Sequence, residues 1–102
     1  MSQRRPDEQG DTKTRTKVTK PRLYKVLIHN DDYTSMEFVV FVLQSVFSHS
    51  MAGATRIMLH VHKNGIGVAG VYTKGIAETR VIKTIDLARE SGHPLQCTME
   101  PE

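Results

Sequence analysis

The chain from residue 22 onward contains three segments whose hydrophobic pattern is typical of strands. Over residues 22–29 alternate positions form one fully apolar side, which predicts a strand with a single buried face. A glycine-punctuated apolar run predicts a second strand at 66–73, where the glycines indicate close backbone approach. A third, short strand is predicted at 95–99.

Three other segments carry hydrophobic residues three and four positions apart, which is the period of a helix. They predict helices at 35–47, from 51 to about 63, and from 74 to about 91. The first has so wide an apolar stripe that we expect it to be largely buried.

Side chains able to cap helices stand at the predicted helix boundaries. Thr34 is expected to cap the first helix, in a capping box completed by Glu37. Ser50 and Thr73 are the expected caps of the other two helices. Gly65, after Asn64, is expected to end the second helix, because glycine adopts the left-handed conformation at little cost.

The predicted order of elements is β-α-α-β-α-β, with short connections and no internal repeat. The simplest arrangement is a small two-layer α+β domain, with an antiparallel or mixed three-stranded sheet covered by three helices. Residues 22–102 would form this domain. Residues 1–21 have almost no aliphatic side chains and are expected to be a disordered basic tail.

Composition limits the function classes that fit this chain. Residues 1–21 hold six Lys or Arg against three Asp or Glu, whereas residues 22–102 hold eight of each. A neutral domain argues against a nucleic-acid partner, because phosphate contacts require clustered cations. No apolar run is long enough to span a membrane, so no membrane partner is expected. Cys97 is the single cysteine, which permits no internal disulfide and favours a cytoplasmic location.

The segment from His29 to Phe38 carries the strongest chemical signal. Asn30, Asp31 and Asp32 place hydrogen-bond acceptors in a polar turn, directly before a helix whose first turn carries Met36. This pairing suits a ligand with a cationic, donor-rich end and an apolar end.

A second patch in the predicted second helix repeats this mixed chemistry. Met58, Val61 and His62 fall at positions i, i+3 and i+4 and therefore share one face. His62 can be a neutral acceptor near pH 7. Taken alone, the patch is also compatible with two core residues beside a histidine near a helix end.

Four segments together resemble ClpS, the family of adaptors of the Clp ATP-dependent protease. They are LYKVLIHNDDYTSMEFV (23–39), MLHVHKNG (58–65), GVYTKGIAETR (70–80) and HPLQCTME (93–100). The resemblance covers nearly all of residues 23–100, in order and at consistent spacing. It implies an adaptor and not an enzyme, with no cofactor and no metal.

The resemblance implies that the protein recognises N-degrons, meaning substrate proteins whose first residue is Leu, Phe, Tyr or Trp. It would deliver them, as a monomer, to the N-terminal domain of the unfoldase ClpA. The substrate's α-amino group would be bound by Asn30, Asp32 and His62, with Asp31 beside them. The residues that would line the side-chain pocket are Thr34, Met36, Val39, Met58, Val61 and Leu95. Met36 would act as a gatekeeper against β-branched first residues. The residues in the region that matches the unfoldase-docking segment are Tyr72, Thr73, Glu78 and Arg80.

Two positions depart from the family pattern, which usually has proline at the position of Ser35 and often an apolar residue at that of Gln96. These departures leave open an adaptor with narrowed or altered specificity. A ribosome-associated or nucleic-acid-associated α/β module is a further alternative, because the N-terminal segment is basic. A metal or acid–base site is disfavoured, since His60 and His62 are two apart on a helix and point to different sides.

Overall fold

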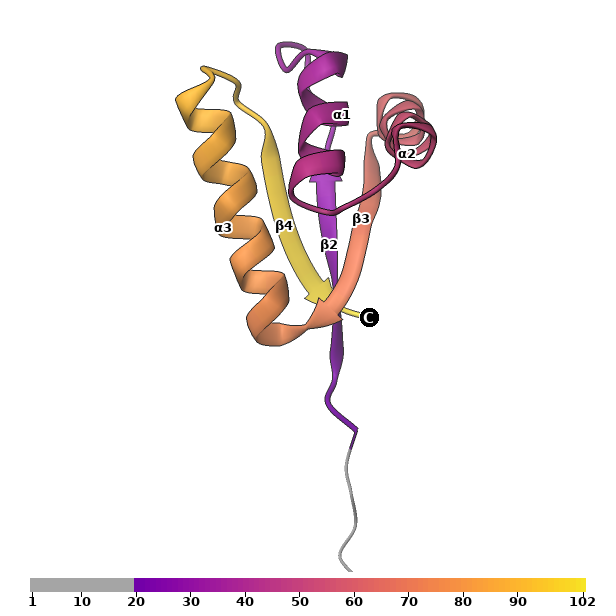
Figure 1. Ribbon diagram of the computed structural model, residues 1–102, viewed down its shortest axis with the longest axis vertical. Coiled ribbons are helices and arrows are strands. Elements are labelled where there is room, and N and C mark those ends of the chain that lie inside the picture. The colour runs from indigo at the N-terminus through magenta and orange to yellow at the C-terminus, as the bar shows by residue number, and fades with distance from the viewer. Residues whose placement is uncertain (1–19) are drawn as a thin grey trace, which may run out of the picture.

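The computed structural model describes residues 20–102, and within this range the fold is built on an antiparallel sheet. The sheet contains β2 (Leu23–His29), β3 (Ile66–Thr73) and β4 (Gln96–Pro101). The strand order is β3-β2-β4, so the first of these strands in the sequence lies in the centre (Figure 1). The predicted tail over 1–21 falls almost entirely outside the described residues.

Three helices complete the described part of the chain: α1 (Met36–Ser45), α2 (Met51–Asn64) and α3 (Lys74–Glu90). Figure 1 shows α1 over the central strand, α2 beside β3 and α3 along β4. The order is β-α-α-β-α-β, so the predicted α+β fold class and all six predicted elements are confirmed over these residues.

The core lies between the helices and one face of the sheet. Val26 and Ile28 on the central strand are fully buried there, as the alternation over residues 22–29 predicts. The opposite face of the sheet is more open, and Ile66 and Val68 on it are each 40% exposed. The domain therefore has two layers, with one sheet face left without a helix among the described residues.

Close packing of α2 against β3 depends on a glycine. A Cβ atom added at Gly67 would lie 2.7 Å from a methyl carbon of Val61, which is too short for a normal contact. Because Gly67 has no side chain, α2 can rest directly on the strand backbone. A larger residue at position 67 would therefore push Val61, and with it this part of α2, away from the strand.

The predicted cap of the first helix is wrong by one residue. Ser35, not Thr34, is the N-cap, and its hydroxyl oxygen accepts a hydrogen bond from the backbone N–H of Phe38 at 3.1 Å. The hydroxyl group of Thr34 instead donates to the carboxylate of Asp31. A capping box between Thr34 and Glu37 therefore does not form.

The ends of α2 and α3 agree with the predicted boundaries to within one residue. Ser50 caps α2 and accepts a hydrogen bond from the N–H of Gly53 at 3.1 Å, and Gly65 ends that helix with a φ of 88°. Thr73 stands at the N-cap position of α3 but its side chain makes no capping bond. α1 ends at Ser45, two residues earlier than predicted, and Phe41 on it is 51% exposed, so the helix is less buried than predicted.

Candidate functional site

The polar turn between β2 and α1 is organised by the carboxylate of Asp31. One oxygen accepts hydrogen bonds from the backbone N–H groups of Tyr33 and Thr34, at 2.8 and 2.7 Å. The other accepts from the hydroxyl group of Thr34 at 2.7 Å. These bonds fix the conformation of the turn and hold the hydroxyl group of Thr34 against the carboxylate of Asp31.

The same contacts set the protonation state of Asp31. Partial burial acts to raise the pKa of its carboxyl group, but the hydrogen bonds from Thr34 and Tyr33, with nearby His93, outweigh burial. The net result is a pKa below the ordinary value of 3.8. Asp31 is therefore ionised at neutral pH, and its oxygens are occupied by the turn.

A backbone hydrogen bond connects this turn to the end of α2. The N–H of Asn30 donates to the carbonyl oxygen of Gly65 at 2.9 Å. Gly65 is the left-handed C-cap of α2, so the polar turn and the last turn of α2 are held side by side. This connection brings the two patches identified in the sequence to one place.

A small pocket of about 200 Å³ lies where these segments meet. Its lining residues are Asn30, Asp32, Thr34, Met36, Val39, Met58, Val61 and His62. Val39, Met58 and Val61 are buried and supply an apolar floor, whereas Asn30, Asp32 and His62 are exposed. The pocket therefore combines an apolar interior with polar groups that solvent can reach.

The polar groups of the pocket are available to a ligand. Within residues 20–102, no hydrogen bond or ion pair involves the side chains of Asn30, Asp32 or His62. An amide oxygen, a carboxylate and a neutral imidazole nitrogen can each accept a hydrogen bond. Together they can satisfy a cationic group with several donors.

Two residues of the predicted site do not line this pocket. The carboxylate of Asp31 is engaged in the turn and is not among the lining residues. Leu95 is 6% exposed and lines a separate cavity beneath the end of α3, next to His93 and Pro94. The sequence could not show that Leu95 lies there, because this depends on how the segment between α3 and β4 packs against α3.

The four residues of the predicted docking segment gather near the start of α3. Thr73 and Glu78 are exposed there. Arg80 is half-buried: its guanidinium group lies 5.3 Å from the ring centroid of Tyr72 and donates to the carbonyl oxygen of Val46 at 3.0 Å. Arg80 thus also joins α3 to the segment that follows α1.

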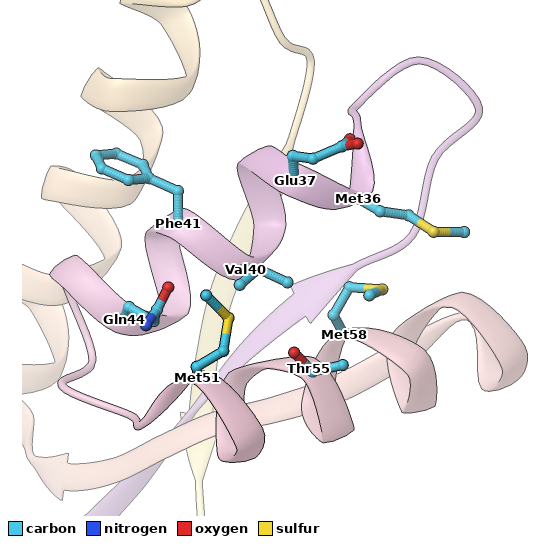
Figure 2. Close-up of a pocket in the computed structure, with 8 residues that line it drawn as sticks. All are labelled: Met36, Glu37, Val40, Phe41, Gln44, Met51, Thr55 and Met58. Carbon is cyan, nitrogen blue, oxygen red and sulfur yellow. The ribbon is translucent and has the colours of Figure 1, made fainter.

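A second hollow adjoins the pocket, and it was not predicted from the sequence. It is a groove between α1 and α2, and Figure 2 shows its lining residues. The available signal was helical spacing: Met36, Val40 and Gln44 share one face of α1, and Met51, Thr55 and Met58 lie four and three residues apart on α2. The sequence could not show that these two faces meet.

Across residues 20–102, no group of three or more His, Cys, Asp or Glu side chains is placed to hold a metal ion. None of the described helices combines the length and the apolar character that a membrane crossing requires.

The described residues form a small α+β domain with a pocket that combines polar and apolar side chains. The family model "ATP-dependent Clp protease adaptor protein ClpS" matches residues 19–98. The ClpS adapter of Caulobacter vibrioides (strain NA1000 / CB15N) is 55% identical over 109 residues, covering 100% of both chains. That of Hyphomonas neptunium is 60% identical over 91 residues, covering 89% of this chain and 77% of the relative.

A solved structure supports the same assignment. Agrobacterium tumefaciens ClpS2, bound to L-phenylalaninamide, matches with a TM-score of 0.79 and 46% identity, covering 81% of this chain and 100% of that one. The chain belongs to the ClpS family of ATP-dependent Clp protease adaptors. The predicted resemblance is confirmed, and the protein is an adaptor and not an enzyme.

Proposed function

We propose that this adaptor recognises the first residue of substrate proteins when it is Leu, Phe, Tyr or Trp and its α-amino group is free. The observation that carries the proposal is the meeting of Asn30, Asp32 and His62 with an apolar floor in one pocket. A relative, ClpS2, is described as bound to L-phenylalaninamide, a ligand with a free α-amino group and an aromatic side chain.

The polar rim matches a protonated α-amino group. Such a group has three donors and no acceptor, and Asn30, Asp32 and His62 offer three acceptors. Hydrogen bonds to a charged group contribute about 1.5–3 kcal/mol each. A substrate without this charge loses most of that contribution.

The apolar floor matches the side chain of the first residue. Val39, Met58 and Val61 form a buried surface, and burying a Leu or Phe side chain against it contributes about 1.5–3 kcal/mol. Met36, which is 43% exposed, stands at the edge of the pocket. In this position it would exclude side chains branched at Cβ, such as those of Ile and Val.

The proposal continues with delivery of the bound substrate to the unfoldase ClpA. Thr73, Glu78 and part of Tyr72 present an accessible surface near the start of α3, on which the N-terminal domain of ClpA would dock. The adaptor would act as a cytoplasmic monomer, since one pocket and one docking surface suffice for a bridge between substrate and unfoldase.

Fluorescence anisotropy tests recognition of the first residue. Labelled peptides that differ only at residue one would be compared, with Leu, Phe, Tyr, Trp, Ile and Met at that position. We expect tight binding for the first four and at least tenfold weaker binding for Ile. Equal affinity for Phe and Ile would contradict the proposed role of Met36.

A degradation assay with ClpA and its peptidase tests delivery. Glu78→Arg is the suitable variant, because Glu78 is exposed, whereas Arg80 has contacts within the domain. We expect Glu78→Arg to slow degradation of a Phe-initiated reporter while peptide affinity stays unchanged. Unchanged degradation would remove this surface from the docking site.

A further inference from the structure

The groove between α1 and α2 continues directly from the recognition pocket. It has a volume of about 430 Å³ and is lined by Met36, Glu37, Val40, Phe41, Gln44, Met51, Thr55 and Met58. Met36 and Met58 line both the groove and the pocket, so the two hollows share a wall. A peptide chain that left the pocket across these two methionines would enter the groove.

The groove surface is mostly apolar although it faces solvent. Met51 is 61% exposed and Phe41 is 51% exposed. Methionine side chains are flexible and polarisable, and they adapt to apolar groups of different shape. Glu37 supplies a negative charge near the end shared with the pocket. Such a surface fits apolar side chains and repels acidic ones.

The length of the groove corresponds to a few residues of extended chain. In Figure 2, Met36 and Met58 lie near one end, and Gln44 and Met51 lie near the other. Gln44 lies eight positions after Met36 on α1, which is about 12 Å along the helix axis. An extended chain covers about 3.3–3.6 Å per residue, so three to four residues span the groove.

We propose that this groove binds the second to fourth residues of the substrate and selects apolar side chains there. The inference rests on the proposed function, because it requires the first residue to occupy the adjoining pocket. Continuity through Met36 and Met58 is the reason for assigning the groove to the same polypeptide. The adaptor would then read a short N-terminal sequence and not one residue alone.

The test compares three labelled peptides that all begin with Phe and share a C-terminal part. Residues two to four are Ala-Ala-Ala, Leu-Leu-Ala or Asp-Asp-Ala. The measured quantity is the affinity ratio between the Leu-Leu and Ala-Ala peptides, for which we expect about tenfold. The Asp-Asp peptide should bind more weakly than the Ala-Ala peptide, and Glu37→Gln should narrow that difference.

Met51→Ser tests whether the groove causes the preference, because this side chain is exposed and lies between the helices (Figure 2). The ratio should fall toward one in Met51→Ser. Leu59→Ser is the matched control, since Leu59 is 52% exposed on the same helix but does not line the groove. The ratio should stay near ten in this control.

A ratio that is the same in Met51→Ser and in the original protein would overturn the inference. The inference would equally be overturned if Met51→Ser left all peptide affinities unchanged but had another effect. Slower delivery would mean that the unfoldase occupies the groove, and a changed oligomeric state would mean that a second copy of the chain does. Phenylalaninamide, used as a competitor, separates the two proposals. If phenylalaninamide does not displace the labelled peptides, the proposed function of the pocket is wrong. If it does displace them but the Leu-Leu peptide binds no more tightly than the Ala-Ala peptide, only the inference about the groove is wrong.

Discussion

The carboxylate of Asp31 acts on the pocket through the backbone. Its two oxygens accept three hydrogen bonds from Tyr33 and Thr34, and these bonds hold the turn that presents Asn30 and Asp32. The neighbouring Asp32 has no partner among the described residues and lines the pocket. The two adjacent aspartates therefore differ in their surroundings: Asp31 holds the turn, whereas Asp32 faces the pocket, where we propose that it binds the substrate.

This difference predicts that substitutions at the two residues affect different properties, stability at Asp31 and binding at Asp32. Asp31→Ala should lower the free energy of unfolding by about 1 kcal/mol, because it removes the hydrogen bonds that hold the turn. Asp32→Ala should change stability little but weaken binding of a Phe-initiated peptide by about tenfold or more. Urea unfolding and anisotropy measure the two quantities. Equal loss of stability in both variants would contradict the assigned roles.

The pKa of Asp31 adds a pH dependence at the same residue. Its folded-state pKa lies below 3.8, so the carboxylate contributes stability that is fully present well above pH 3.8 and is lost as the pH falls through the folded-state value. In Asp31→Asn this contribution is removed. Urea unfolding between pH 5 and pH 3 should therefore show a steeper loss of stability in the original protein than in the variant. Parallel curves would contradict the proposed hydrogen bonds.

At the scale of elements, the start of α1 determines where Met36 stands. Ser35 caps the helix by accepting from the N–H of Phe38, so Met36 is the first helical residue and lies at the edge of the pocket. Thr73 occupies the same kind of position before α3 but makes no capping bond. Substituting each of these two residues by alanine therefore isolates the contribution of the capping hydrogen bond.

Ser35→Ala should lower the free energy of unfolding by about 1 kcal/mol, because one backbone donor of α1 loses its partner. Thr73→Ala should cost less, since no side-chain bond is lost there. Thermal and urea unfolding of both variants test this order. A larger loss in Thr73→Ala would mean that the capping bond of Ser35 contributes little.

Periodicity sufficed to predict the six elements, because each buries one face against a single core and its pattern follows that burial. It failed at the cap of α1, because Thr34 and Ser35 are both good caps and the choice depends on Asp31 accepting the hydroxyl of Thr34. The pocket was predictable in outline because Asn30 and Met36 are close in sequence. The groove could not be predicted, because its two sides come from α1 and α2 and the sequence does not show how these helices are placed relative to each other.

At the scale of the whole molecule, two residues near the middle of α3, one turn apart, join this helix to the rest of the domain. Arg80 reaches the carbonyl oxygen of Val46 and the ring of Tyr72. Farther along α3, the fully buried Thr84 lies against Cys97 on β4. Cys97 is 4% exposed, and burial raises the pKa of its thiol to about 11.

The thiol of Cys97 should therefore report opening of the whole domain. At pH 8 it is protonated and buried, and because the thiolate is the nucleophile, a thiol reagent should react with the native protein far more slowly than with protein in urea. Because the pKa is raised from 9.0, stability should also fall as the pH rises above 9, where the unfolded chain releases this proton first. Rapid labelling of the native protein at pH 8 would contradict the burial of Cys97 beneath α3.

The proposed function requires that the pocket bind a charged α-amino group and an apolar side chain together. The most direct measurement compares two labelled peptides of the same sequence beginning with Phe, one with a free and one with an acetylated amino group. Acetylation removes the charge and two donors, so at pH 7 we expect the affinity to fall by about 100-fold or more. Equal affinity of the two peptides would show that Asn30, Asp32 and His62 do not bind the α-amino group.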